Sequence, residues 1–350
     1  MINRLLAAAS AMTHPMVPDN VINLVNPLWS SREIRARVKA VRMETKDAAT
    51  IVLQPGRPVQ MHRAGQHFRV GVDIDGVRHW RTYSLTSPSG RTDGTFEITV
   101  KAMPGGLVSN HLVHRTNPGD MIRIEGPLGD FVLPEDQPIK ALFVTAGSGI
   151  TPVMGMLRTL EHHGTTADVM HVHSALTPDD VIFGAELREM AVNGLALHEQ
   201  HTDAMGLLTF DRIAAICPDW RDRDVWVCGP AGMLDAATEF WTAAGLLHRL
   251  HLERFTAFDY AITEQARAEV TFGRSAKTAS TEGGETLLDL GEQAGVLMPS
   301  GCRMGICFSC VIPLKEGRIR DVRTGEVHGE PGDLIQTCIS TPCTDTVLDV

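Results

Sequence analysis

The sequence has no long apolar run, few aromatic residues and no excess of positive charge. A membrane-spanning helix needs roughly 18 or more apolar residues in succession, and none of the 350 residues lies in such a run. The 32 lysines and arginines are outnumbered by 42 aspartates and glutamates, and this formal net charge of −10 argues against a nucleic-acid partner. Aromatic residues make up 5% of the chain and only two residues are tyrosines, so a tyrosine inside a motif is informative.

The seven cysteines are an odd number and do not suggest a disulfide framework. Cys302, Cys307 and Cys310 follow a C-x4-C-x2-C pattern, and Cys338 comes after 27 intervening residues. Thiolates at this spacing are typical ligands of a plant-type [2Fe–2S] cluster. Structural zinc, which usually pairs two short cysteine hooks, and a disulfide staple are the alternatives. The unpaired cysteines favour a reducing compartment, so we expect a cytoplasmic protein.

Residues 1–32 are predicted to form an extension, because Pro15, Pro18 and Pro27 interrupt any long element. The first twelve residues carry one charge, Arg4, and a minimal apolar run. This pattern predicts a short helix rather than a signal peptide. Peripheral contact of this helix with the inner face of a membrane is an open alternative.

Three domains are predicted after the extension. Residues 33–135 contain short alternating strands separated by turns, which indicates an antiparallel β-barrel. Residues 136–256 alternate apolar strands with helices, which predicts a Rossmann-like parallel α/β domain. Residues 257–267 read as a linker, and 268–350 as a small α+β domain of the β-grasp type that contains the cysteine loop.

The barrel contains the motif Arg81-Thr-Tyr83-Ser84. A flavin needs an aromatic face, a hydrogen-bond donor near its N5 atom and a cation near its diphosphate, and this strand offers all three. Strand alternation directs Arg81 and Tyr83 to one side and Ser84 to the other. Ser84 therefore needs a bend in the strand, or acts through its backbone as well.

A second barrel motif runs from Lys101 to Ser109, as Lys-Ala-Met-Pro-Gly-Gly-Leu-Val-Ser. Its glycines allow the backbone to approach a phosphate, and the N–H groups of a following helix can hold the anion. Each barrel motif is weak evidence alone, but their order and separation strengthen the pair.

The α/β domain has two glycine-containing turns. In the first, Gly147 and Gly149 follow an apolar strand, and Thr151 is expected to cap the next helix. In the second, Cys228 comes at the end of another strand and is followed by Gly-Pro-Ala-Gly-Met233. The carboxyl ends of parallel strands are where dinucleotides bind, although a buried structural cysteine is the alternative interpretation of Cys228.

These motifs together resemble the ferredoxin-NADP reductase family, over about residues 33–350. The resemblance implies that Ser84 and Cys228 act at the site of hydride transfer, and that the four loop and distal cysteines hold the cluster. The cofactor-binding residues that it implies are Arg81, Tyr83, Ser84, Lys101, Gly106, Leu107, Val108, Ser109, Gly147, Gly149, Ile150, Thr151, Gly229, Pro230, Met233 and Phe255.

The resemblance also implies a function. The order of flavin, nicotinamide and ferredoxin domains occurs in reductases that pass electrons from NAD(P)H through a flavin and a [2Fe–2S] cluster to a separate terminal oxygenase or fatty-acyl desaturase. The local texture is most similar to partners of stearoyl-CoA desaturases and alkane hydroxylases. An aromatic-ring hydroxylase partner, a partner-independent ferric or flavin reductase and a redox-responsive module are the alternatives. We expect a monomer whose partner can be membrane-bound.

Cofactor choice follows from the same comparison of motifs. The compact loop ending at Ser109 favours FAD over FMN. Leu176 stands where many relatives that use NADPH carry an arginine, which favours NADH over NADPH. Fifteen histidines form several close pairs but no His-Glu-x-x-His motif, and we expect them at the surface or locally hydrogen-bonded. Phe308 and Ser309, within the cysteine loop, are candidate partner-facing residues.

Overall fold

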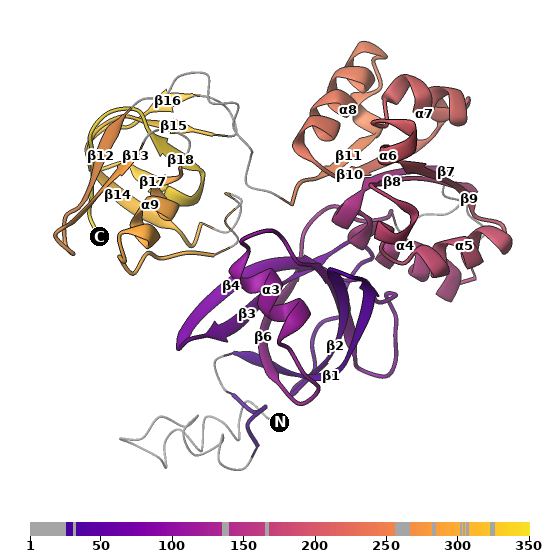
Figure 1. Cartoon of the computed structure of the whole chain (residues 1–350), viewed down its shortest axis with the longest axis horizontal. Helices are drawn as coiled ribbons and strands as arrows, with labels where there is room; N and C mark the ends of the chain where they lie inside the picture. Colours follow the sequence, from indigo (N-terminus) through magenta and orange to yellow (C-terminus); the bar gives the residue numbers. More distant parts are fainter. Residues whose placement is uncertain are drawn as a thin grey trace. The chain divides into compact units, whose positions relative to one another are not determined.

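The computed structural model describes residues 26–30, 33–134, 140–164, 168–255, 267–281, 285–301, 303, 305, 308–322 and 326–350. The chain forms two compact units, Met1–Glu253 and Arg254–Val350 (Figure 1). The first unit contains an antiparallel sheet and a parallel sheet, and the second contains two small sheets.

The antiparallel sheet of the first unit has six strands in the order β4-β3-β6-β1-β2-β5. An isolated bridge between Leu85 and Ile98 connects the end of β4 toward β5 and helps to close the sheet into a barrel. Helix α3 (Leu107–His114) comes after β5 in the chain, separated from it by a short loop. The strands are β1 (Ile34–Thr45), β2 (Ala48–Pro55), β3 (His67–Ile74), β4 (Val77–Ser84), β5 (Phe96–Lys101) and β6 (Met121–Leu128).

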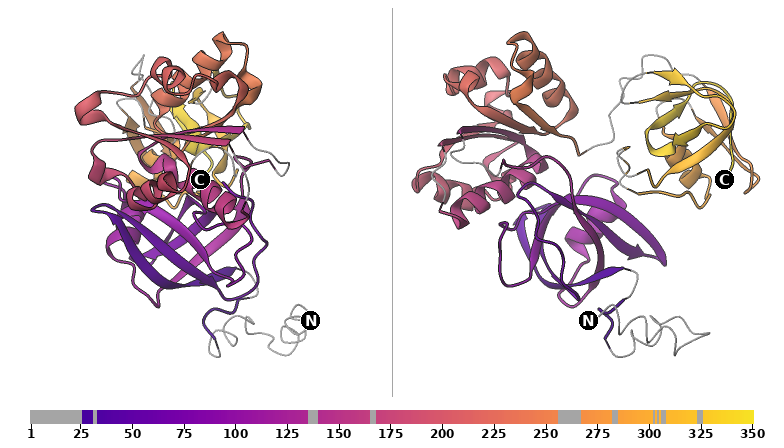
Figure 2. Two further views of the ribbon diagram at one scale, coloured as in Figure 1. Left: turned by 90° about the vertical axis from the view of Figure 1, so that its right-hand side faces the viewer. Right: turned by 180° about the vertical axis from the view of Figure 1, so that it is seen from behind.

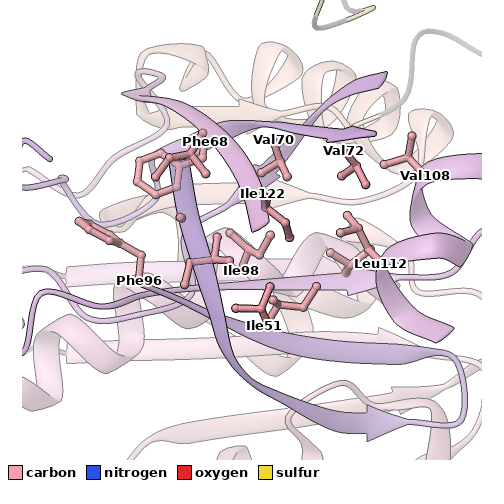
Figure 3. Packing of buried hydrophobic residues seen from close by; sticks show 14 of the residues in the cluster. Ile51, Phe68, Val70, Val72, Phe96, Ile98, Val108, Leu112 and Ile122 are labelled. Carbon is pink, nitrogen blue, oxygen red and sulfur yellow. The ribbon is translucent and has the colours of Figure 1, made fainter. Parts of the chain in front are cut away.

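Alternating side chains of these strands fill the interior of the barrel (Figure 3). On β3, Phe68, Val70 and Val72 are buried, and every second residue points outward. Burying one such side chain contributes about 1.5–3 kcal/mol. Helix α3 packs on the same cluster through Val108 and Leu112, so the loop before α3 is fixed to the barrel core.

The parallel sheet has the order β11-β10-β7-β8-β9. Figure 1 shows α4 and α5 on the side of this sheet that faces the barrel, and α7 and α8 on the opposite side; Figure 2 shows the same layers in two further views. The strands are β7 (Lys140–Ala146), β8 (Asp168–Ala175), β9 (Ala196–His201), β10 (Asp224–Cys228) and β11 (Leu250–Glu253). The helices are α4 (Ile150–His162), α5 (Gly184–Val192), α6 (Thr202–Met205), α7 (Phe210–Ile216) and α8 (Ala231–Ala243).

Helix α4 joins the parallel sheet to the barrel. The Arg158 guanidinium donates to the Thr86 carbonyl at 2.8 Å and to Glu186 at 2.7 Å, and lies 3.3 Å from the Glu97 carboxylate. Gly155 lies so close to Leu85 that an added Cβ would be 2.3 Å from its carbonyl oxygen. Helix α4, which begins at the first glycine turn, therefore packs directly against Leu85 and Thr86, the two residues that follow Ser84 at the end of β4.

The second unit contains a mixed sheet, β13-β12-β19-β14-β17, in which β12 and β19 are parallel and the other pairs are antiparallel. A smaller sheet has the order β16-β15-β18. Helix α9 (Leu287–Gln293) packs its leucines into the core with strand residues such as Phe272 and Ile312. The strands are β12 (Ala268–Phe272), β13 (Lys277–Thr281), β14 (Val311–Glu316), β15 (Ile319–Asp321), β16 (Val327–His328), β17 (Leu334–Gln336), β18 (Ser340–Pro342) and β19 (Thr346–Leu348).

The predicted fold class, an antiparallel barrel, a parallel α/β domain and a small α+β domain, is confirmed. Helix α5 begins at Gly184, directly after Phe183, which takes a left-handed conformation with φ of 62°. Residues 257–266 of the predicted linker and most of the N-terminal extension lie outside the described residues. Within the part of the chain that the structure describes, no helix combines the length and the apolarity needed to cross a bilayer.

Candidate functional site

The Arg81-Thr-Tyr83-Ser84 motif lies on β4, an edge strand of the barrel sheet. Tyr83 stands opposite Phe68 and packs on the barrel core. Burial raises the pKa of Tyr83, although the Arg81 guanidinium opposes the shift, so the phenol stays protonated. Ser84 is 4% exposed and lies opposite His67 in the antiparallel pairing of β3 and β4. An edge strand with a fixed tyrosine and a neighbouring guanidinium fits the needs of a flavin.

The loop before α3 fits a phosphate. The helix begins after Gly106 without a side-chain cap, so the N–H groups of its first turn have no acceptor within the helix. The Ser109 hydroxyl accepts from the Met103 N–H at 3.1 Å, and Asn110 donates to the Met103 and Gly106 carbonyls at 2.7 Å each. A Cβ on Gly106 would be 2.5 Å from the Ser109 hydroxyl, so a larger residue here would displace this hydroxyl from its hydrogen bond with the Met103 N–H.

Lys101 already has a partner. Its ammonium donates to both carboxylate oxygens of Asp47, at 2.7 Å each. Its predicted contact with the cofactor stays a prediction.

The first glycine turn lies between β7 and α4. Gly147 has a φ of 53°, which favours glycine. A Cβ on Gly149 would be 2.1 Å from the Cys228 carbonyl oxygen, so this position also excludes a side chain. The expectation that Thr151 caps the helix is wrong, because the 3-10 turn Gly147–Gly149 runs directly into α4. Thr151 is the second helical residue, and its hydroxyl donates back to the Ser148 carbonyl at 3.0 Å.

A cavity of about 820 Å³ opens at the carboxyl ends of β7 and β8, beside the start of α8. Of the predicted residues, Gly147, Pro230 and Met233 line it, whereas Ile150 and Thr151 are buried. The full lining is Ala146, Gly147, Ser174, Ala175, Leu176, Thr202, Leu207, Leu208, Thr209, Phe210, Asp211, Pro230, Gly232, Met233, Ala236, Glu239 and Phe240. Its size and position fit part of a dinucleotide.

Cys228 ends β10 and is completely buried between Thr145 of β7 and Glu253 of β11. Burial, and secondarily the Glu253 carboxylate, raise the pKa of the Cys228 thiol well above its usual value. It is therefore a neutral, apolar group rather than a nucleophile. A Cβ on the next residue, Gly229, would be 2.9 Å from the Met233 sulfur, so the backbone turns tightly here.

Glu253 was not predicted as a site residue. Burial, and then the nearby Asp130 carboxylate, raise the pKa of Glu253 to about 7. Such a carboxyl group can take up or release a proton near neutral pH. In the sequence, only the position of Glu253 at the end of a strand could have indicated a role. Asp130 is far from it in the chain, so the sequence does not indicate that the two carboxylates lie near each other.

Two histidines lie in the core. His171 and His173 are fully buried, and their Nε2 and Nδ1 atoms lie 2.8 and 2.7 Å from the Thr145 hydroxyl. Burial lowers the pKa of both, that of His173 to about 4. The second ring nitrogen of each imidazole, His171 Nδ1 and His173 Nε2, has no hydrogen-bond partner among the described residues. The expectation that the histidines lie at the surface or are locally hydrogen-bonded is therefore met for this pair at only one nitrogen of each ring.

Two of the four predicted cluster ligands are described, and they lie together. The Cys310 and Cys338 sulfurs are 3.2 Å apart, buried and not disulfide-bonded. The contact with Cys338 lowers the pKa of the Cys310 thiol, which favours the thiolate that iron binds. Thr337 braces the pair by donating its hydroxyl to the Cys310 carbonyl at 3.0 Å. Cys302 and Cys307 lie outside the described residues.

Around the cysteine loop, Phe308 is 66% exposed and has a φ of 55°. Arg303 also has a positive φ and forms ion pairs with Glu292 and, at 3.6 Å, with Asp289, both on α9. Phe255 belongs to the second unit, and its predicted role at the flavin stays a prediction.

Three family models match the chain in order. They are the oxidoreductase FAD-binding domain at residues 35–133, the oxidoreductase NAD-binding domain at 143–239 and the 2Fe-2S iron-sulfur cluster binding domain at 270–343. These modules define an NAD(P)H oxidoreductase with FAD and a [2Fe–2S] cluster.

Whole-chain relatives agree. The chain is 48% identical to an NADPH oxidoreductase of Mycobacterium tuberculosis, over 98% of this chain and 91% of the relative. It is 29% identical to the glycine betaine monooxygenase reductase subunit of Pseudomonas aeruginosa, over 93% and 99%. Phthalate dioxygenase reductase shares the fold, with a TM-score of 0.64 and 23% identity over 90% of this chain and 97% of that structure. The chain belongs to the ferredoxin-NADP reductase family, in the group with a C-terminal [2Fe–2S] domain.

Proposed function

We propose that the protein is the reductase component of a two-protein oxygenase system. It takes electrons from NAD(P)H and delivers them through its C-terminal domain to a separate terminal oxygenase. The observation that carries the proposal is the presence of all three modules on one chain. The relative that is the reductase subunit of a glycine betaine monooxygenase supports this choice of acceptor.

The residues of the chain have positional tasks in this reaction. When bound, a flavin accepts two electrons together as a hydride and passes them on singly to a one-electron cluster. Arg81 and the first turn of α3 would hold the diphosphate, and Tyr83, fixed by the barrel core, would offer a flat face. Ser84 would donate a hydrogen bond, Cys228 would exclude water with its buried neutral thiol, and Glu253 would hold or release a proton near neutral pH.

A membrane-bound fatty-acyl desaturase is the second candidate acceptor. The segment Asn26–Ser30 resembles the corresponding segment of desaturase partners, and Trp29 within it is 49% exposed. We also propose that the reductase acts in the cytoplasm and that it is a monomer. Light scattering after size exclusion would test the monomeric state.

The acceptor is tested by direct transfer. The protein, reduced anaerobically by NADH, is mixed with an oxidised terminal oxygenase or with a desaturase in vesicles, and acceptor reduction is followed by absorbance. Reduction of the oxygenase that is lost in Cys338→Ser supports the proposal. Fast reduction of the desaturase alone selects the second candidate, and reduction of neither by an otherwise active enzyme refutes both.

A further inference from the structure

The cavity at the carboxyl ends of β7 and β8 has an apolar mouth. Leu176, after β8, is 59% exposed, and Leu207, after α6, is 82% exposed. The two segments are joined, because the Asp203 N–H donates to the Leu176 carbonyl at 3.2 Å. Large apolar side chains gain little by facing water, but they can pack against the flat faces of an adenine.

The charged side chains among the lining residues are both acidic. They are Asp211 on α7 and Glu239 on α8, and both are exposed. Neither has an ion pair within the described part of the chain. Among the residues that the structure describes, no lysine, arginine or histidine lines the cavity.

Two basic residues are sequence neighbours of the lining. The Arg212 guanidinium contacts the Met205 sulfur at 3.7 Å, and the His201 imidazole lies 3.1 Å from the Glu199 carboxylate. Glu199 also pairs with Arg188 at 2.8 Å. None of these three side chains belongs to the lining of the cavity.

We infer that this cavity selects a dinucleotide with a free ribose 2′-hydroxyl, so that the enzyme prefers NADH to NADPH, with Leu176, Asp211 and Glu239 as the specificity-determining residues. A phosphate monoester carries a charge of about −1.5 to −2 and needs cationic partners, whereas a carboxylate accepts hydrogen bonds from ribose hydroxyls. The inference rests on the proposed function. It departs from the name of the Mycobacterium tuberculosis relative, an NADPH oxidoreductase.

Binding of nucleotide fragments to the full-length protein tests the inference without turnover. Calorimetry would compare 5′-AMP with adenosine 2′,5′-bisphosphate, which differ only in the 2′-phosphate. We expect 5′-AMP to bind on the order of tenfold more tightly, and the gap to shrink at high salt because the repulsion is screened. Equal or tighter binding of the bisphosphate would overturn the inference and would direct attention to Arg212.

A double variant that makes the cavity less acidic tests two of the named residues, Leu176 and Asp211. Leu176→Arg combined with Asp211→Asn should tighten bisphosphate binding at least about tenfold and should weaken 5′-AMP binding, because the apolar contact with the adenine and a carboxylate acceptor for the ribose are both lost. The matched control is Leu247→Arg combined with Asp75→Asn, which makes the same change of +2 in net charge at two exposed residues outside the lining. If the control gives the same gain, the effect is one of net charge and the assignment of these residues fails.

Steady-state assays separate this inference from the proposed function. A lower KM for NADH than for NADPH at similar kcat supports the inference. Similar KM values for both would refute it and leave the proposed function intact. No reduction by either nucleotide in protein that contains FAD and the cluster would refute the proposed function itself.

Discussion

At the scale of single residues, Thr145 holds two buried histidines with one hydroxyl. The hydroxyl can donate to one ring nitrogen and accept from the other, so the tautomers of His171 and His173 are coupled through it. Thr145→Val keeps the shape and removes both bonds. We expect a loss of about 2–4 kcal/mol in the free energy of unfolding, because two buried nitrogens lose their partner.

Urea unfolding of the full-length protein would measure this loss. Thr242→Val, at an exposed position of α8, is the matched control and should change stability by less than about 0.5 kcal/mol. Equal effects of the two substitutions would show that the hydroxyl of Thr145 does not hold the pair.

Phe308 combines an exposed aromatic side chain with a strained backbone. A positive φ costs a non-glycine residue about 1–2 kcal/mol, and the side chain, 66% exposed, regains little of this by burial. Phe308→Gly should therefore keep or raise the thermal stability of the protein but slow reduction of the acceptor protein several-fold. Dye reduction by the flavin should stay unchanged.

Leu297→Ala, at an 89% exposed position of the same unit, is the control for general loss of surface area. If Phe308→Gly lowers stability and leaves transfer to the acceptor unchanged, Phe308 has a packing role and does not face the partner.

At the scale of elements, α4 connects the dinucleotide turn with the flavin strand. Replacing glycine by alanine within a helix usually stabilises it by about 1 kcal/mol. Gly155→Ala should do the opposite, because the new Cβ would be 2.3 Å from the Leu85 carbonyl oxygen, which is backbone of the barrel. We expect a loss of more than about 2 kcal/mol in the free energy of unfolding.

The control is Gly232→Ala on α8, where an added Cβ meets nothing within 4 Å. Its stability should stay the same or rise. A stabilising Gly155→Ala would mean that α4 does not lie against the barrel as closely as described.

At the scale of the whole molecule, buried titratable groups set the dependence of stability on pH. The pKa of His67 and of His173 is lowered by burial to about 4, against about 6.5 in the unfolded chain. The unfolded state therefore binds protons first as the pH falls, and stability declines between pH 6.5 and 4. Glu253, with a pKa raised to about 7, acts in the opposite direction, since its contribution is lost as the pH rises from about 4.5 to 7.

Matched variants give opposite changes. Between pH 4.5 and 6.5, His173→Gln should flatten the rise of stability with pH by up to about 1.4 kcal/mol per pH unit, and Glu253→Gln should steepen it by a similar amount. Denaturant unfolding at several pH values measures both slopes. Changes of the same sign in the two variants would contradict the assigned pKa shifts.

The sequence predicts the fold class and the order of the modules because these depend on local patterns. Alternating apolar residues mark the barrel strands, and the glycine turns and cysteine spacing mark where cofactors bind. The pairing of Glu253 with Asp130 and the convergence of Leu176, Asp211 and Glu239 on one cavity could not be predicted, since each joins residues far apart in the chain. The capping role of Thr151 was predicted wrongly for a local reason. The 3-10 turn Gly147–Gly149 continues directly into α4, so Gly149 and not Thr151 occupies the N-cap position.

The central claim is that electrons enter from the nicotinamide, pass the flavin and leave through the cluster. Its most direct test is anaerobic reduction of the wild type and of Cys338→Ser by NADH, followed by reduction of ferricyanide and of cytochrome c. The account predicts flavin reduction and ferricyanide reduction in both proteins, with cytochrome c reduction at least about tenfold slower in the variant. Cytochrome c reduction at the wild-type rate in Cys338→Ser, or wild-type protein without flavin absorption, would contradict it.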